Sequence, residues 1–187
     1  MLPYEPVGLD LSLTSTGIAV GNATWAITAK NLTGVERLIS IRDQIIEMLQ
    51  ALSDDLSPHN AIAVIVEGYS FGSRNSHAHA LGELGGVVRV ALAEGKWDYV
   101  EVPPTCRAKF ATGRGNAGKS EVVSAISART GLVWSGAGAE DRCDAWILQE
   151  MALAKLGAAR HEWPQTHLAA LEKIDWNVIS VNMEGNQ

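Results

Sequence analysis

The stretch Gly8-Leu9-Asp10-Leu11-Ser12-Leu13-Thr14-Ser15-Thr16-Gly17 sets one carboxylate in an apolar segment and follows it with a polar turn. We interpret Val7–Ser12 as a buried strand with Asp10 in its middle, and Thr14–Gly17 as a turn. Burying an aspartate in such a strand is costly unless the carboxylate is paired or bound to a metal. Asp10 is therefore the first candidate functional residue.

The rest of the chain alternates between segments with strand patterns and segments with helical spacing. Apolar runs and turn residues predict four further strands, at Ile18–Val20, Thr24–Thr28, Ala61–Val66 and Tyr99–Val102. Apolar residues at helical spacing predict helices at Val35–Leu56, Ser76–Glu94, Lys119–Thr130, Asp141–Leu156 and His167–Ile174. This order predicts an α/β protein with a mixed five-stranded sheet and helices on both faces.

The length and composition indicate one globular domain without a membrane segment. The chain has 187 residues, of which 47% are hydrophobic and 19% charged, so a packed core is expected. We expect a core at about residues 7–158 and a helical tail at 163–187. No run of about 18 apolar residues and no secretion signal is present. With only Cys106 and Cys143 as cysteines, a reduced, cytoplasmic setting is expected.

Three more carboxylates stand where a metal site could form. Glu67 ends the apolar run Ala-Ile-Ala-Val-Ile-Val, and Asp141 and Asp144 share one face at the start of a predicted helix. Each has an ordinary alternative: Asp141 as a helix cap, Asp144 as a solvated acid, Glu67 as a strand end. Together with Asp10 they have the composition of a site for hard divalent cations such as Mg²⁺ or Mn²⁺. Two such ions can clamp the attacking and leaving oxygens of a phosphodiester displacement.

The segments that carry these acids occur in the order found in a known family. Gly-Leu-Asp10-Leu-Ser-Leu-Thr-Ser-Thr-Gly17-Ile-Ala, then Val-Ile-Val-Glu67, then Asp141-Arg-Cys-Asp144-Ala resemble the RuvC-type Holliday junction resolvases. The resemblance runs from about Val7 to Ala158, and the short turn Ser12–Gly17 is similar to that of compact members encoded by bacteriophages.

The resemblance implies an RNase H-like fold, a homodimer and four acidic metal ligands, which would be Asp10, Glu67, Asp141 and Asp144. The implied activity is that of a crossover junction endodeoxyribonuclease in DNA recombination and repair. It would use two Mg²⁺ or Mn²⁺ ions per site and leave nicks with 5′ phosphate and 3′ hydroxyl ends. The implied location is the cytoplasm, which for a phage-encoded protein is that of the host.

A basic segment stands out in an acidic chain. The net charge is −6, yet Thr105–Gly131 holds five basic residues against one acidic residue. Cations of this kind neutralise DNA phosphates. The resemblance implies that Lys119 assists catalysis or holds the scissile phosphate, and that Arg107 and Lys109 contact DNA. Arg114 lies in the same strip. For Arg107, Lys109 and Arg114 a solvated surface charge is the alternative.

The resemblance also concerns the loop after Glu67, where the family has an aromatic residue that stacks on bases. Here the sequence is Glu67-Gly68-Tyr69-Ser70-Phe71, so the aromatic residues are offset by one position. Tyr69 or Phe71 could stack on bases, or Tyr69 could pack in the core. Arg74 follows in the same loop and could contact a phosphate.

Three glycines lower the helix propensity of Ser76–Glu94, namely Gly82, Gly85 and Gly86. Close approach of another helix would compensate, and this helix resembles the dimer interface of the family. A two-fold dimer suits a junction that has two symmetric strands to cut. The alternative is packing of the glycines on the protein's own sheet.

Other functions remain open alternatives. Gly113–Ser120 satisfies the phosphate-loop pattern of nucleotide-binding proteins, although the preceding Pro103–Thr112 looks helical and not like the strand such a loop requires. Asp10–Gly17 is also similar to a phosphate loop of actin-like ATPases, which need two lobes. A non-enzymatic junction-binding protein is a third possibility. A related nuclease acting on flaps or RNA–DNA hybrids is a fourth.

Overall fold

The computed structural model describes residue 2 and residues 4–56, 61–68 and 76–179, with only the backbone described for 76–78. Its five strands form one sheet in the order β3-β2-β1-β4-β5. They are β1 (Tyr4–Asp10), β2 (Thr16–Val20), β3 (Ala23–Ile27), β4 (Ala61–Glu67) and β5 (Asp98–Val102). The first three strands pair antiparallel, whereas β4 and β5 run parallel to β1. The predicted mixed five-stranded sheet is confirmed.

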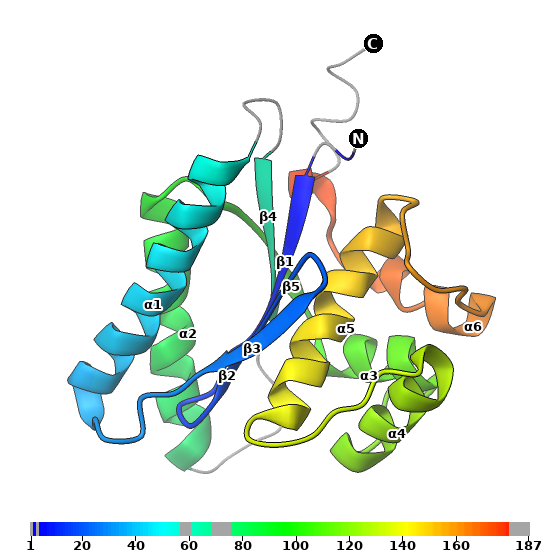
Figure 1. Cartoon of the computed structure of the whole chain (residues 1–187), viewed down its shortest axis with the longest axis horizontal. Helices are drawn as coiled ribbons and strands as arrows, with labels where there is room; N and C mark the ends of the chain where they lie inside the picture. Colours follow the sequence, from blue (N-terminus) through cyan, green and yellow to red (C-terminus); the bar gives the residue numbers. More distant parts are fainter. Residues whose placement is uncertain (1, 3, 57–60, 69–75, 180–187) are drawn as a thin grey trace.

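Helices cover both faces of this sheet, as predicted. They are α1 (Gly34–Asp55), α2 (Ser76–Glu94), α3 (Pro104–Thr112), α4 (Lys119–Thr130), α5 (Ala139–Lys155) and α6 (Gln165–Leu168), followed by a 3-10 turn at Leu171–Lys173. Helices α1 and α2 lie on one face, and α5 lies on the other with α3, α4 and α6 around it (Figure 1). None of the described helices is long and apolar enough to cross a membrane.

The alternation of side chains along β4 explains why two separate cores form. Ile62, Val64 and Val66 pack against α1 and α2, whereas Ala63 and Ile65 pack on the α5 side. Successive side chains of a strand point to opposite faces, so a strand covered on both sides must be apolar throughout. The next position on the α5 side is that of Glu67, which ends the strand.

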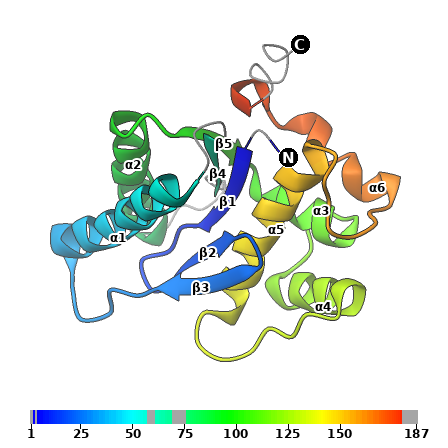
Figure 2. The same cartoon turned by 45° about the horizontal axis from the view of Figure 1, so that its top comes forward.

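Helix α5 lies directly on β1 and β2 because two glycines leave room for it (Figure 2). A Cβ at Gly8 would overlap the carbonyl oxygen of Ala145, and a Cβ at Gly17 would overlap that of Asp141. Gly17 is also the antiparallel partner of Asp10. The two glycines therefore bring the first turns of α5 next to the end of β1.

The structure differs from the sequence-based expectation at several element ends. Strand β1 runs from Tyr4 to Asp10, so Asp10 ends the strand instead of lying in its middle. The expected helix His167–Ile174 is replaced by α6 and the 3-10 turn, because tertiary contacts govern this short segment. There the His167 ring hydrogen-bonds to the carbonyl oxygen of Phe110 at 2.6 Å, which ties the tail to α3.

Candidate metal site at the ends of β1 and β4

Two of the candidate acids lie side by side because of strand register. Asp10 is the last residue of β1 and Glu67 is the last residue of β4. The two strands are parallel, with Leu9 opposite Val66, so both acids lie at the same edge of the sheet. Ligands bind at this carboxyl-terminal edge in open α/β sheets. Both side chains belong to the α5 face, since they follow the alternation of their strands.

Helix α5 contributes the other two acids. One oxygen each from Asp10, Glu67 and Asp144 lies within 4.8 Å of the others, an arrangement that could hold a metal ion. Asp141 lies one turn earlier in α5, at the edge of this cluster, with its side chain 18% exposed. It does not cap the helix, because α5 begins at Ala139 and its N-cap residue is Gly138.

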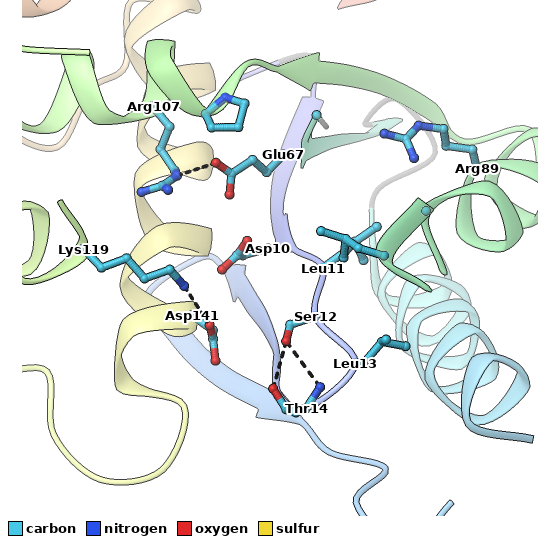
Figure 3. Close-up of a pocket in the computed structure, with 14 residues that line it drawn as sticks. Asp10, Leu11, Ser12, Leu13, Thr14, Glu67, Arg89, Arg107, Lys119 and Asp141 are labelled. Carbon is cyan, nitrogen blue, oxygen red and sulfur yellow. Dashed lines mark hydrogen bonds and ion pairs between the residues drawn. The ribbon is translucent and has the colours of Figure 1, made fainter. Parts of the chain in front are cut away.

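Two cations face the acids, and Figure 3 shows both. Arg107 donates from Nε to Oε1 of Glu67 at 3.0 Å and from Nη1 to Oδ1 of Asp144. Lys119 Nζ lies 3.4 Å from Oδ1 of Asp141 and 3.8 Å from Oδ2 of Asp144. The Arg107 residue is 7% exposed, so the alternative of a solvated surface charge is wrong for it.

The surroundings raise the pKa values of the two buried aspartates, Asp10 and Asp144. Burial raises the pKa of Asp10 well above its usual value, and the negative charges of Glu67 and Asp144 raise it further. Burial likewise raises the pKa of Asp144 to about 6, although Arg107 acts in the opposite direction. Holding these buried, negatively charged carboxylates close together costs free energy, and a bound cation would offset that cost.

The donor set fits a divalent metal ion. Oδ2 of Asp144 is buried and accepts no hydrogen bond from the described residues. Buried polar atoms normally have a partner, and a metal ion could be the partner of this oxygen. Four carboxylates and the two cations Arg107 and Lys119 leave a net charge of −2 when all are ionised. Hard divalent cations prefer carboxylate oxygens of this kind.

A pocket of about 390 Å³ opens onto the acids. Asp10, Glu67, Arg107, Lys119 and Asp141 form its polar wall (Figure 3). Other lining residues were not assigned to a site by sequence reasoning: Leu11, Leu13, Leu81, Arg89 and Pro104. The three leucines could not be singled out in the sequence, since leucines next to a strand and along a helix also occur in any core.

The remaining predicted site residues lie elsewhere. Arg114 is exposed and forms an ion pair with Glu121, and Lys109 is half-buried on α3. Tyr69, Phe71 and Arg74 lie outside the described residues, so their predicted roles are untested. The phosphate-loop alternative lacks its structural context, because Gly113–Ser120 follows helix α3 and not a strand, and its last two residues already belong to helix α4.

Comparisons with known proteins concern the fold. No family model and no curated protein matches this chain. The solved structure of Thermus thermophilus RuvC is similar, with a TM-score of 0.59 and 22% identity over 84% of this chain and 99% of that chain. The T. thermophilus RuvC structure in complex with a Holliday junction substrate has a TM-score of 0.59 and 20% identity, over 84% of this chain and 98% of that one. The chain therefore has the RNase H-like fold of RuvC, as the resemblance in its sequence implied.

Proposed function

We propose that this protein is a metal-dependent endonuclease that cuts branched DNA, with the four-way Holliday junction as its substrate. The observation that carries the proposal is the convergence of Asp10, Glu67 and Asp144 beside Asp141 and Lys119 at one sheet edge. The fold supports it, since a protein of this fold has been solved with a Holliday junction. Fold alone does not determine function, so the argument rests on the acids.

The acids would hold Mg²⁺ or Mn²⁺, with two ions per site in the active complex. Asp10, Glu67 and Asp144 would be the inner ligands, and Asp141 would complete the set from the edge of the pocket. A divalent ion bound here supplies Lewis acidity toward the scissile phosphate and a water nucleophile. The protein's own contribution is to hold four carboxylates in fixed positions at the end of a rigid sheet.

Lys119 would hold the scissile phosphate. Its side chain is 54% exposed, yet its Nζ lies near Asp141 and Asp144. Burial opposes its positive charge, but Asp10, Asp144 and Asp141 raise its pKa above the usual value, so the amine stays protonated. Arg114 and Lys109, on the adjoining helices and loop, would contact the DNA backbone away from the cut.

A homodimer through α2 completes the proposal. Within the described residues, a Cβ at Gly86 would meet no atom within 4 Å, so this glycine is not explained by packing on the protein's own sheet. Val90 lies one turn further along α2 and is 59% exposed. The two residues line a shallow groove between α1 and α2, which a second copy could cover. Two sites related by a two-fold axis would cut the two strands of a junction.

The experiment that tests the function is cleavage of a labelled four-way junction against linear duplex, flap, fork and RNA–DNA hybrid. Each substrate is incubated with Mg²⁺, Mn²⁺ or EDTA. We expect paired nicks near the crossover that require metal. Better cleavage of flaps, forks or hybrids would support the proposed metal site but contradict the four-way junction as the substrate.

The matched variants are Asp10→Asn and Asp54→Asn. Asp54 is exposed on α1 and takes no part in the site. Asp10→Asn removes a ligand at nearly constant volume, so cleavage should fall at least about 100-fold while junction binding persists. Asp54→Asn should cleave like the wild type. Full cleavage by Asp10→Asn would contradict the assignment of the site.

A further inference from the structure

Arg107 is the only buried arginine among the residues that the structure describes. It sits between two of the proposed metal ligands. Its Nε and Nη1 donate to one oxygen of Glu67 and one oxygen of Asp144. The guanidinium is a planar fork with fixed donor directions, so it can hold two carboxylates at a set angle.

The backbone fixes Arg107 in this place. Val102, the last residue of β5, pairs with Glu67, and the amide of Gly68 donates to the Val102 carbonyl oxygen at 2.9 Å. Two prolines follow Val102, and the second of them, Pro104, begins α3. Arg107 is thus one turn into a helix that starts beside Glu67. Its neighbours Cys106, Ala108, Phe110 and Ala111 are buried, so α3 cannot easily shift.

The way in which Arg107 holds Asp144 leaves the second oxygen of that carboxylate for a ligand. Arg107 contacts Oδ1 of Asp144, whereas Oδ2 of the same group accepts no hydrogen bond from the described part of the chain. Lys119 Nζ forms an ion pair with this oxygen at 3.8 Å, which is longer than a hydrogen bond. With Arg107 committed to two acids, its exposure of 7% leaves little surface for DNA.

We propose that Arg107 is a positioning residue of the metal site, which holds Glu67 and Asp144 by one oxygen each and presents their remaining oxygens, with Asp10, to a divalent ion. This inference rests on the proposed function only in taking the acidic cluster to be a metal site. It replaces the direct DNA contact that the sequence resemblance implied for Arg107.

Two roles for a cation in an acidic site have opposite consequences when the cation is removed. If Arg107 only balanced charge, its loss would make the site more negative and would strengthen metal binding. If Arg107 orients the ligands, its loss lets Glu67 and Asp144 move, and metal binding weakens. Partners that orient metal ligands typically contribute about 10- to 100-fold in affinity.

The experiment is calorimetric titration of Mn²⁺ into the metal-free protein at pH 8 without DNA. Wild type, Arg107→Gln, Arg107→Lys and Arg42→Gln are compared. Arg42 lies on α1 and pairs with its neighbour Asp43, away from the site. We expect the dissociation constant to rise about 10- to 100-fold for Arg107→Gln and by a smaller factor for Arg107→Lys, which keeps the charge but loses the fork. Arg42→Gln should match the wild type.

Tighter or unchanged Mn²⁺ binding by Arg107→Gln would overturn the proposal. Thermal unfolding in EDTA checks that each variant folds, and Arg107→Lys carries the test if Arg107→Gln does not fold. Failure of this inference is separable from failure of the proposed function. A wild type that cuts junctions while Arg107→Gln binds Mn²⁺ normally contradicts only the inference. A wild type that binds Mn²⁺ but cuts no DNA, with weakened binding in Arg107→Gln, contradicts only the function.

Discussion

Gly17 lies against the carbonyl oxygen of Asp141 so closely that a Cβ at Gly17 would overlap it, well inside the 3.0 Å that real Cβ atoms keep. Gly17 is also the strand partner of Asp10. One residue without a side chain therefore links the strand that ends in Asp10 to the helix turn that carries Asp141. The site depends on this backbone contact as much as on the acids.

Gly17→Ala should weaken both stability and metal binding. The added methyl group would meet backbone, which cannot rotate away, so α5 must move off β2. Overpacking of this kind costs about 1–3 kcal/mol in the free energy of unfolding. Urea unfolding in EDTA measures that cost. Calorimetric titration with Mn²⁺ should show weaker binding, because Asp141 and Asp144 move with α5.

The control for this substitution is Gly86→Ala, since a Cβ there would meet no described atom within 4 Å. Gly86 lies in the proposed dimer groove, so this control concerns the metal site alone. Gly86→Ala should bind Mn²⁺ like the wild type, because the acids lie elsewhere in the chain. Equal stability and equal Mn²⁺ affinity for Gly17→Ala and wild type would show that α5 does not need this close approach.

Much of the candidate site could be read from the sequence because strand geometry is periodic. A continuous apolar run that ends in Glu67 indicated a strand buried on both faces, and parallel strands place their carboxyl ends at one edge. The spacing of Asp141 and Asp144 indicated one helix face. The sequence-based prediction that Asp10 lies in the middle of its strand was wrong, because β1 ends at Asp10 and a turn follows.

The burial of Arg107 could not be read from the sequence in the same way. The residues around it, Pro-Thr-Cys-Arg-Ala-Lys-Phe, show no clear apolar face, so neither burial nor exposure is favoured. Its position follows from where α3 starts relative to β5 and Glu67, which is a tertiary relationship. The same limit applies to the apolar wall of the pocket, which combines Leu11 and Leu13 with Leu81 from α2.

Metal binding should strengthen as pH rises through about 6. Burial raises the pKa of Asp144 to about 6, and Asp10 is shifted in the same direction. A protonated carboxyl group is a poor ligand, so below pH 6 the apparent Mn²⁺ affinity should fall about tenfold per pH unit as Asp144 becomes protonated. Calorimetric titrations at pH 5 and pH 8 measure this. Equal affinity at the two pH values would contradict the shift.

The same shift should destabilise the metal-free protein as pH rises. Between the usual aspartate pKa of 3.8 and about 6, folded Asp144 keeps its proton whereas the unfolded chain loses it. The folded state then binds more protons, so the free energy of unfolding falls with rising pH, by an amount on the order of 1–3 kcal/mol. Thermal unfolding in EDTA at pH 5 and pH 8 should show this loss, and added Mn²⁺ should reverse it at pH 8.

Lys119→Ala should impair cleavage more than binding. Removing one cation that stabilises developing charge on a phosphate typically costs about 100- to 1000-fold in rate, whereas one phosphate contact is a small part of junction affinity. Single-turnover cleavage and gel-shift binding separate the two effects. The control is Lys155→Ala, an exposed lysine at the far end of α5 that should cleave normally. Loss of ATP binding in Lys119→Ala would instead favour a nucleotide-binding protein.

Light scattering should show a dimer, with a mass near twice 20.0 kDa. If α2 forms the interface, Val90→Glu should shift the protein to monomer, because burying an unpaired carboxylate between two copies is costly. The matched control is Val133→Glu, on the loop between α4 and α5, where the valine is 85% exposed. That variant should remain dimeric.

A monomeric Val90→Glu should still bind Mn²⁺, since the acids lie within one chain. It should nick junctions in one strand instead of two, because paired cuts need two sites. A wild type that stays monomeric even on junction DNA would contradict the two-fold arrangement and leave the metal site standing.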